Sequence, residues 1–412
     1  MRSLYVAGRN RQQGIALLLI IIVIALTAIT FFISNMSARD LEFENNARTN
    51  DALKKAKKAL LAYAANYPEI TGANRGPGYL PCPDLDNDGV SVVIGCNPAG
   101  VVNVGRFPWV TVGAGDLRDG ANEGLWYAVA DTFDYTNSPA VNKVNSATTG
   151  NITVRDNNNN IRFDGTTGNG IVAVILAPGE ALVRSDAYVQ DRSPATGDPN
   201  DPLNYLDIAF GEDNASFQHG TLDGFISGVV RPGAQVQVND IVEVITYDEI
   251  MEVIHQRVAG ELANALIAYA DIANCGNLPE ASAFDPTKAV GLYTSDAGVR
   301  QGHVPVDSTE WNPGNCADGL LPVWLEAEDW HKVTYYHVAA SVPCTIGVDC
   351  LTVNNVNPPI TDADLVVTFA GRDLNGVRHI NNINEYYENE NADLDLVYDA
   401  AESNDRVCPL IP

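Results

Sequence analysis

The sequence predicts an α+β protein in which one long N-terminal helix is followed by two tandem units, each a helix packed on a small antiparallel sheet. Three observations lead to this fold class. An uncharged apolar run lies near the N-terminus, a helical pattern of apolar residues follows it, and a series of short motifs in the first half recurs in order in the second. The 412 residues are enough for two or three ordinary domains.

The first expected element is an apolar helix from Ile15 to Ile33, a run without a charged side chain. At 1.5 Å per residue it is about 28 Å long, enough to cross the hydrocarbon core of a bilayer. Three arginines (Arg2, Arg9 and Arg11) precede the run and acidic residues follow it, which favours a cytoplasmic N-terminus. We therefore expect one transmembrane span in contact with inner-membrane lipid, with the rest of the chain outside that membrane.

The helix is expected to continue beyond the span to about Asn66. Apolar residues recur there at 3-4-3-4 spacing, which places them on one face of a helix, and lysines fall between them. Pro68 ends the pattern. This part of the helix is expected to lie against a globular head through Leu53, Ala56, Leu60, Tyr63 and Tyr67.

The junction between the basic leader and the apolar run carries a further signal. The leader ends in Gln13-Gly14, and the apolar helix starts at Ile15. This resembles the type IV prepilin cleavage and methylation signal, in which a dedicated peptidase cuts after the glycine and the apolar stretch stays on the mature protein. The resemblance implies cleavage between Gly14 and Ile15 and packing of residues 15–33 against other subunits of a bacterial pilus or pseudopilus.

Two other interpretations of this segment stay open. A cleavable secretory signal has an apolar core of about 7–15 residues and a small-x-small cleavage site. This run is longer, and Met36-Ser37-Ala38 is a poor cleavage site. The second alternative is a plain single-span anchor.

The chain departs from the pilin pattern at one position. Pilins and pseudopilins usually carry Glu at the fifth mature residue, where this chain has Leu19. In the family this Glu is thought to pair with the N-terminal amine of a neighbouring subunit. A minor pseudopilin of type II secretion that sits at the filament tip also lacks it, so the resemblance implies a tip or initiating role.

An internal duplication defines the two units. The segment at residues 59–64 recurs at 265–270, and each copy is followed by Leu-Pro. Further pairs follow in the same order: 107–109 with 321–324, 126–130 with 335–339, 171–176 with 365–369, and 239–242 with 404–407. The predicted organisation is a leader at 1–14, a transmembrane half-helix at 15–33, an amphipathic helix and first pilin-like unit at 34–247, and a second pilin-like unit at 248–412.

Seven cysteines lie beyond the apolar run, with no CxxC and no zinc-type spacing. In an oxidising periplasm they can pair. Short loops favour Cys82–Cys96 and Cys344–Cys350, which leaves Cys275–Cys316 as the third pair and Cys408 as the odd residue. The alternative is that several of them are buried thiols.

The best candidate site is an acidic loop. Asp84, Asp86 and Asp88 alternate, and Gly89 follows them. This is the first half of a calcium loop, because a hard cation takes oxygen ligands at this spacing. Position twelve is Gly95 rather than Glu, so the motif is not a full EF-hand, and an ordinary acidic turn remains the alternative.

Charge and motifs exclude several function classes. A net charge of −27 opposes nucleic-acid binding. There is no HExxH, GxSxG or phosphate-binding loop, and His331 and His337 have no third ligand in the sequence, so no enzyme is expected. The sequence therefore favours a structural minor subunit of a type II secretion pseudopilus or type IV pilus. The alternative is an anchored periplasmic or surface binding module, similar to a calcium-dependent adhesin.

Overall fold

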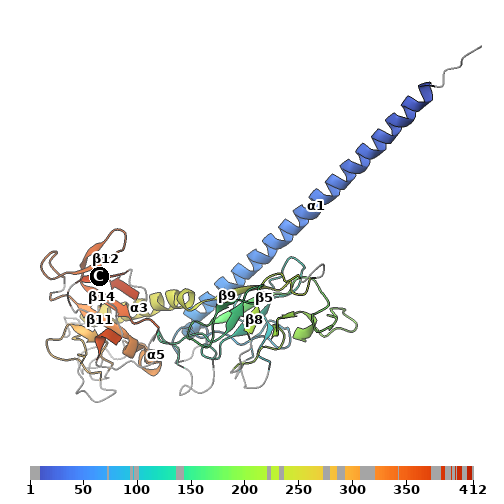
Figure 1. Cartoon of the computed structure of the whole chain (residues 1–412). Helices are drawn as coiled ribbons and strands as arrows, with labels where there is room; N and C mark the ends of the chain where they lie inside the picture. Colours follow the sequence, from blue (N-terminus) through green and yellow to red (C-terminus); the bar gives the residue numbers. More distant parts are fainter. Residues whose placement is uncertain are drawn as a thin grey trace, which may run out of the picture.

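The computed structural model describes residues 10–71, 74–92, 96, 102–135, 143–219, 224–231, 236–271, 279–284, 293–306, 321–341, 343–372, 382–385, 391, 395, 397–400 and 406–410. In the first helix, side chains are described at residues 17–31 and 40–65. Figure 1 shows a straight helix that leaves a head with two parts. We call the part up to Thr246 the first unit and the part from Tyr247 onward the second unit.

Helix α1 (Asn10–Ala65) is the long N-terminal helix, and its two ends have different surroundings. Near its C-terminus Leu53, Ala56 and Leu60 are at most 2% exposed, whereas Lys54 and Lys55 face solvent. The spacing of the apolar residues therefore packs one face of the helix on the head. The N-terminal part of α1 stands away from the head (Figure 1).

The prediction of a transmembrane span at residues 15–33 is wrong for the chain that the structure describes, where no helix is both long and apolar enough to cross a membrane. The described side chains of the run extend from Leu17 to Phe31. The predicted localisation as a single-pass inner-membrane protein is corrected with it.

The first unit is built on a four-stranded antiparallel sheet in the order β1-β2-β5-β9, which lies against α1. Its strands are β1 (Gly105–Arg106), β2 (Trp126–Val129), β5 (Ala173–Ala177) and β9 (Ile241–Ile245). Every residue of β2 and β5 is buried, so these two strands form the centre of the first unit's core.

The second unit repeats this arrangement on its own helix, α3 (Tyr247–Asp271). Its four-stranded antiparallel sheet has the order β10-β11-β14-β16. The strands are β10 (Gln301–His303), β11 (Thr334–Val338), β14 (Leu365–Phe369) and β16 (Arg406–Leu410). The two central strands, β11 and β14, are again buried along their whole length.

A three-stranded sheet accompanies each large sheet, in the orders β4-β3-β8 and β13-β12-β15. The bounds are β3 (Thr153–Arg155), β4 (Ile161–Phe163), β8 (Gly224–Ile226), β12 (Leu351–Asn354), β13 (Ile360–Ala363) and β15 (Val397–Asp399). In both, the middle strand pairs in parallel with the last one. A hairpin and short helices complete the described elements: β6 (Ile208–Ala209), β7 (Glu212–Asp213), α2 (Tyr67–Thr71), η1 (Pro202–Asn204), α5 (Val323–Ala327), α6 (Trp330–Val333) and η2 (Ile383–Glu385).

The predicted fold class is therefore wrong about the sheets. The described residues form a mixed α/β structure with five sheets, two of which contain a parallel pair, rather than one small antiparallel sheet per unit. The strands have two to five residues. Strands this short do not show the alternation by which a strand is recognised in a sequence.

Strand register relates the two units residue by residue. Arg106 pairs with Trp126 as His303 pairs with Tyr335. Trp126 and Tyr335 therefore occupy equivalent positions. This agrees with the sequence match of residues 126–130 to residues 335–339.

One motif match fails this comparison. Because Arg106 corresponds to His303, Phe107-Pro108 corresponds to Val304-Pro305. The sequence pairing of Phe107–Trp109 with residues 321–324 is therefore not structurally equivalent, since residues 323–327 form helix α5.

Polar contacts join the two units across a continuous hydrophobic core that contains residues from both. Arg75 and Tyr79 of the first unit meet Glu328 of the second, with 3.3 Å between Arg75 Nη1 and Glu328 Oε1 and a 2.7 Å hydrogen bond from the Tyr79 hydroxyl. Arg75 is 6% exposed and Glu328 is 1% exposed, so this is a buried ion pair. The two units therefore share one interior.

Candidate functional site

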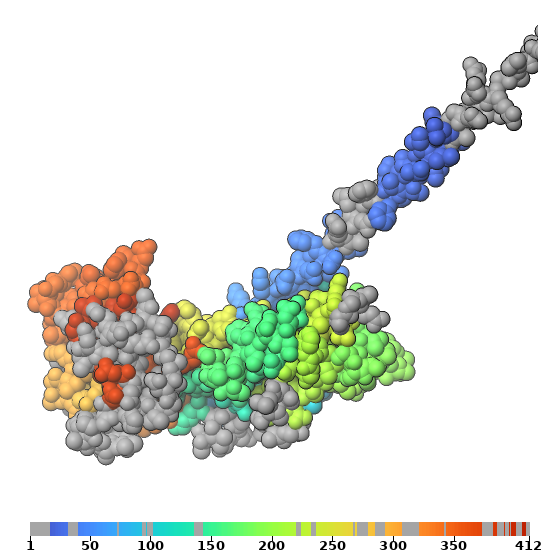
Figure 2. Space-filling view, viewed as in Figure 1, coloured from blue at the N-terminus to red at the C-terminus, as the bar shows by residue number. Residues whose placement is uncertain are grey.

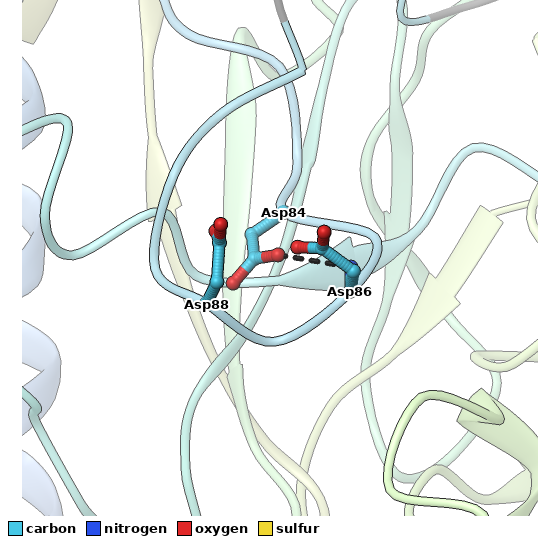
Figure 3. Close-up of side chains that lie close together, drawn as sticks. All are labelled: Asp84, Asp86 and Asp88. Atoms are coloured by element: carbon cyan, nitrogen blue, oxygen red, sulfur yellow. Dashed lines mark hydrogen bonds between the residues drawn. The ribbon is translucent and has the colours of Figure 1, made fainter.

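The acidic loop starts at the edge of the first unit's sheet. Asp84 forms an antiparallel bridge with Arg106 of β1, with both backbone N–H···O bonds made at 2.7–2.9 Å. Asp84 is fully buried, whereas Asp86 and Asp88 are exposed. One carboxylate oxygen from each of the three lies within 4.8 Å of the others. Figure 3 shows the three side chains close together within the loop, with Asp84 between Asp86 and Asp88.

The Asp84 carboxylate organises the loop backbone. Its Oδ1 accepts N–H bonds from Asp86 at 3.0 Å and Asn87 at 2.8 Å, and its Oδ2 accepts one from Gly89 at 2.7 Å. Burial raises the pKa of Asp84, while these backbone bonds act in the opposite direction. The loop is therefore closed by its own hydrogen bonds.

Gly89 is required for both its conformation and its size. Its φ of +84° is in the region that favours glycine. A Cβ on Gly89 would lie 2.5 Å from the Trp109 ring. Trp109 therefore packs directly against the loop backbone.

The donor set fits a hard cation only in part. Asp86 and Asp88 could offer carboxylate oxygens toward Asp84, and Ca²⁺ takes six to eight oxygen ligands of this kind. The twelfth position of the motif, Gly95, lies outside the described residues. Asp84, Asp86 and Asp88 would hold such an ion, and the remaining ligands would come from backbone oxygens or water.

Both short-loop cysteine pairs are bonded. Cys82–Cys96 and Cys344–Cys350 each have a Cα–Cα distance of 5.1 Å, and the first of them encloses the acidic loop. Cys275 and Cys316, the predicted third pair, lie outside the described residues. Cys408 is a thiol whose pKa is raised by burial.

The second unit has the same backbone bridge without the carboxylate. Ser282 pairs with His303 just as Asp84 pairs with Arg106. The two histidines considered as ligands in the sequence are buried in this unit and make hydrogen bonds there. Nδ1 of His331 lies 3.3 Å from the Leu325 carbonyl, and Nδ1 of His337 lies 2.8 Å from the Tyr398 hydroxyl.

The processing residues belong to helix α1. Gly14 and Ile15 lie in its first turns, in a part of the helix whose side chains are outside the described set. Their role stays a prediction from the sequence.

Sequence reasoning missed a pair of buried carboxylates in the first unit. Asp207 and Asp240 are both fully buried. The Asp207 N–H donates to Oδ2 of Asp240 at 2.9 Å, and the Asn239 N–H donates to Oδ2 of Asp207 at 2.8 Å. Burial raises the pKa of Asp207 to about 6, and burial also raises the pKa of Asp240 well above its usual value. Among so many acidic residues, nothing in the sequence distinguished these two.

A buried arginine was missed as well. The Arg106 guanidinium lies over the rings of Trp126 and Tyr205, 4.2 and 4.0 Å from their centroids. It also donates to the carbonyls of Gly124 and Pro199. Its guanidinium therefore holds two backbone segments and packs on two aromatic rings, which is a structural role.

Comparison with protein-family models, with curated proteins and with solved structures gave no match.

Proposed function

We propose that this chain is a minor structural subunit of a helix-packed filament, a type II secretion pseudopilus or a type IV pilus. The observation that carries the proposal is the N-terminal part of α1. The large apolar side chains there, from Leu17 to Phe31, are 44–69% exposed although they belong to a well-formed helix. A helix that is apolar on all sides is stable in water only when other surfaces cover it.

The head does not provide that cover, because α1 leaves it as a straight rod (Figure 2). Helices of other subunits offer a matching surface, since apolar side chains on one helix pack between those of the next. A single flat partner would cover one side only. The distribution of apolar residues therefore favours several neighbouring helices around α1.

The position of this subunit within the filament follows from Leu19. In the pilin pattern, a glutamate at this place neutralises the N-terminal amine of a neighbour. Leu19 has no group to do so, and a charge left unpaired among apolar helices is costly. We propose that the subunit is present in few copies, at a filament tip or in an initiating complex.

Processing by a prepilin peptidase between Gly14 and Ile15 belongs to this proposal. The apolar helix must then remain on the product. N-terminal sequencing of the purified chain tests it: a first residue of Ile15 supports the proposal, and a first residue near Arg39 would mean an ordinary signal peptide.

The assembly itself is tested by one charge on α1. Ile24→Asp places a carboxylate on the free part of the helix, where Ile24 is 60% exposed. The matched control is Ile70→Asp on α2, where Ile70 is 53% exposed on the head. We expect Ile24→Asp to abolish co-purification with filaments and Ile70→Asp to retain it. Normal incorporation of Ile24→Asp would contradict the proposal.

A second candidate function rests on the convergent aspartates. A surface binding module that uses calcium would need Asp84, Asp86 and Asp88 to hold the ion. This candidate requires no filament, so it predicts that calcium affects the head while Ile24→Asp has no consequence for function.

A further inference from the structure

In the first unit, the turn just before β3 docks on the second unit. The turn is closed by an N–H bond from Thr148 to the Asn145 carbonyl. Asn145 Nδ2 donates to the Glu328 carbonyl at 2.9 Å, and Ser146 Oγ lies 2.9 Å from Nε2 of His255. The Ser146 hydroxyl also donates to the Ala370 carbonyl. We call this segment, residues 143–148, the donor turn.

The surface that receives the donor turn belongs to three elements of the second unit. His255 lies on α3, Glu328 lies between α5 and α6, and Ala370 follows β14. Val144 of the donor turn is completely buried against this surface and the neighbouring first-unit backbone at Gly78. The contact is therefore a packed interface between consecutive units of the same architecture.

The second unit carries an equivalent turn. Val353 of β12 pairs in parallel with Tyr398 of β15 just as Val154 of β3 pairs with Phe225 of β8. By this register residues 344–350 correspond to residues 145–151, which share residues 145–148 with the donor turn. An N–H bond from Val348 to the Thr345 carbonyl and the Cys344–Cys350 disulfide fix its shape.

This second turn is uncovered in the chain. Ile346 is 66% exposed and Val348 is 74% exposed. A rigid loop that holds two aliphatic side chains in water loses part of the stabilisation their burial would give, and it is pre-organised for binding. The donor turn of the first unit is covered by the second unit, whereas the 344–350 turn exposes both aliphatic side chains.

The first unit carries the matching acceptor. The helix repeat that relates 59–64 to 265–270 places Thr49 of α1 where His255 stands on α3, and the sheet register places Pro178 where Ala370 stands. A groove of about 680 Å³ lies at this place, between α1 and the loops beside β5 and β9. It is lined by residues that include Leu41, Asn45, Thr49, Ala177, Val229 and Ile241.

We propose that the 344–350 turn of one copy of this chain docks in the α1 groove of a second copy. Among the residues that the structure describes, the donor turn fills its acceptor between the two units, whereas the 344–350 turn is exposed and the α1 groove is open. The groove mixes polar side chains such as Asn45 with apolar ones such as Leu41, in keeping with a contact between separate molecules.

This contact is head-to-tail, because the turn and the groove are different surfaces. A heterologous contact of this kind leaves the same two surfaces uncovered at the ends of every pair. It goes beyond helix-driven assembly, since none of its residues lies at positions 17–31. Helix packing and head docking can therefore be tested separately.

Photo-cross-linking of the full chain tests the proposal. A benzophenone amino acid replaces Val348, and isotopically heavy and light copies are mixed before irradiation. We expect cross-links between heavy and light chains that join position 348 to peptides at 41–49 or 229–241. The control places the same probe at Val323, which is 70% exposed on α5, and should give no such product.

Several outcomes would overturn the proposal. They are cross-links within one chain only, cross-links to other peptides, capture of a different protein in cells, or equal yields from Val323. As a second measurement, the probe is placed at Val229 and the chain carries Ile346→Asp with Val348→Asp. The yield should fall about tenfold, because carboxylates resist burial in an apolar contact. Val323→Asp should leave the yield unchanged, and an unchanged melting temperature in both variants verifies the fold.

Discussion

In the residues that the structure describes, the two units share a packed helix and a strand order, but only the first carries an acidic loop and an extended helix. The backbone bridge at the sheet edge is identical: Asp84 with Arg106 in one unit, and Ser282 with His303 in the other. The architecture is therefore maintained by backbone pairing and by buried strands, whose burial is the same in both units. The chemistry depends on single side chains at equivalent positions.

The helices α1 and α3 also share one part and differ in another. The repeat places the start of α3, Tyr247, at the level of Leu41 in α1. Only the part of α1 that follows this level has a counterpart in the second unit, and it is the part that packs on a sheet. The preceding part of α1, which has no counterpart, exposes its large apolar residues from Leu17 to Phe31, and Leu41 and Phe43 at the boundary are exposed as well. The part of α1 that the second unit lacks is thus available for contacts with other molecules.

The largest expected effect breaks the connection between the two units. Glu328→Gln removes the charge that faces Arg75 in the shared interior, where both side chains are more than nine-tenths buried. Loss of one partner of a buried ion pair costs about 3–5 kcal/mol. Calorimetry should show a lower melting temperature and a separation of one unfolding transition into two.

A matched control distinguishes this effect from general surface charge. Asp329→Asn removes an ion pair with Lys143 that also joins the units, but its side chains are 26% and 36% exposed. A pair of this kind contributes about 0–1 kcal/mol. Equal destabilisation by the two substitutions would show that the buried pair has no special role.

Sequence reasoning reached the parts of this comparison that depend on periodicity and order. The 3-4 spacing located the buried face of α1, and the short cysteine spacings located both disulfides. It failed where elements are too short to show a period. β1 has two residues, so the motifs pair Phe107-Pro108 with Leu321-Pro322, just before α5, whereas the strand register pairs them with Val304-Pro305.

The buried polar residues could not be predicted for a different reason. The chain has 52 acidic residues, and the burial of Asp207 and Asp240 arises from loops far apart in sequence that meet only after folding. The Arg75–Glu328 pair likewise joins residues from the two halves of the chain. Local patterns contain no information about such contacts.

The second prediction is that pH acts with opposite sign through a buried carboxylate of the first unit and two buried histidines of the second. In the first unit burial raises the pKa of Asp207 from 3.8 to about 6, so the folded state binds a proton that the unfolded state has lost between these values. Its contribution to stability is present below pH 4 and is lost as pH rises through about 6. In the second unit burial lowers the pKa of His331 and His337 to about 4. Their contribution is present above about pH 6.5 and is lost as pH falls toward 4.

Each of these contributions to the free energy of unfolding is on the order of 3 kcal/mol between the limiting pH values. Two variants separate them. Urea unfolding between pH 4 and 7.5 should show that Asp207→Asn removes part of the loss of stability at rising pH. His337→Gln should remove part of the loss at falling pH. If both variants keep the pH profile of the parent chain, the buried groups do not control it.

The smallest expected effect concerns calcium, and it tests whether the single difference at Asp84 and Ser282 has a chemical consequence. Calcium at 100 times its dissociation constant would stabilise the folded chain by about 2.7 kcal/mol. The melting temperature should rise on adding calcium, and a chelator should reverse the rise. Asp86→Ala should abolish it, because Asp86 is exposed and provides one of the three converging oxygens without supporting the loop backbone.

The control for this effect is an exposed aspartate of the second unit. Asp362→Ala, on β13, removes the same charge from a place without neighbouring carboxylates in the described cluster, and it should leave the calcium response unchanged. An identical melting temperature with and without calcium would mean that Asp84 serves only to close the loop through its three backbone bonds. In that case the difference between Asp84 and Ser282 is one of loop shape, because the serine side chain has one oxygen and cannot accept the same set of bonds.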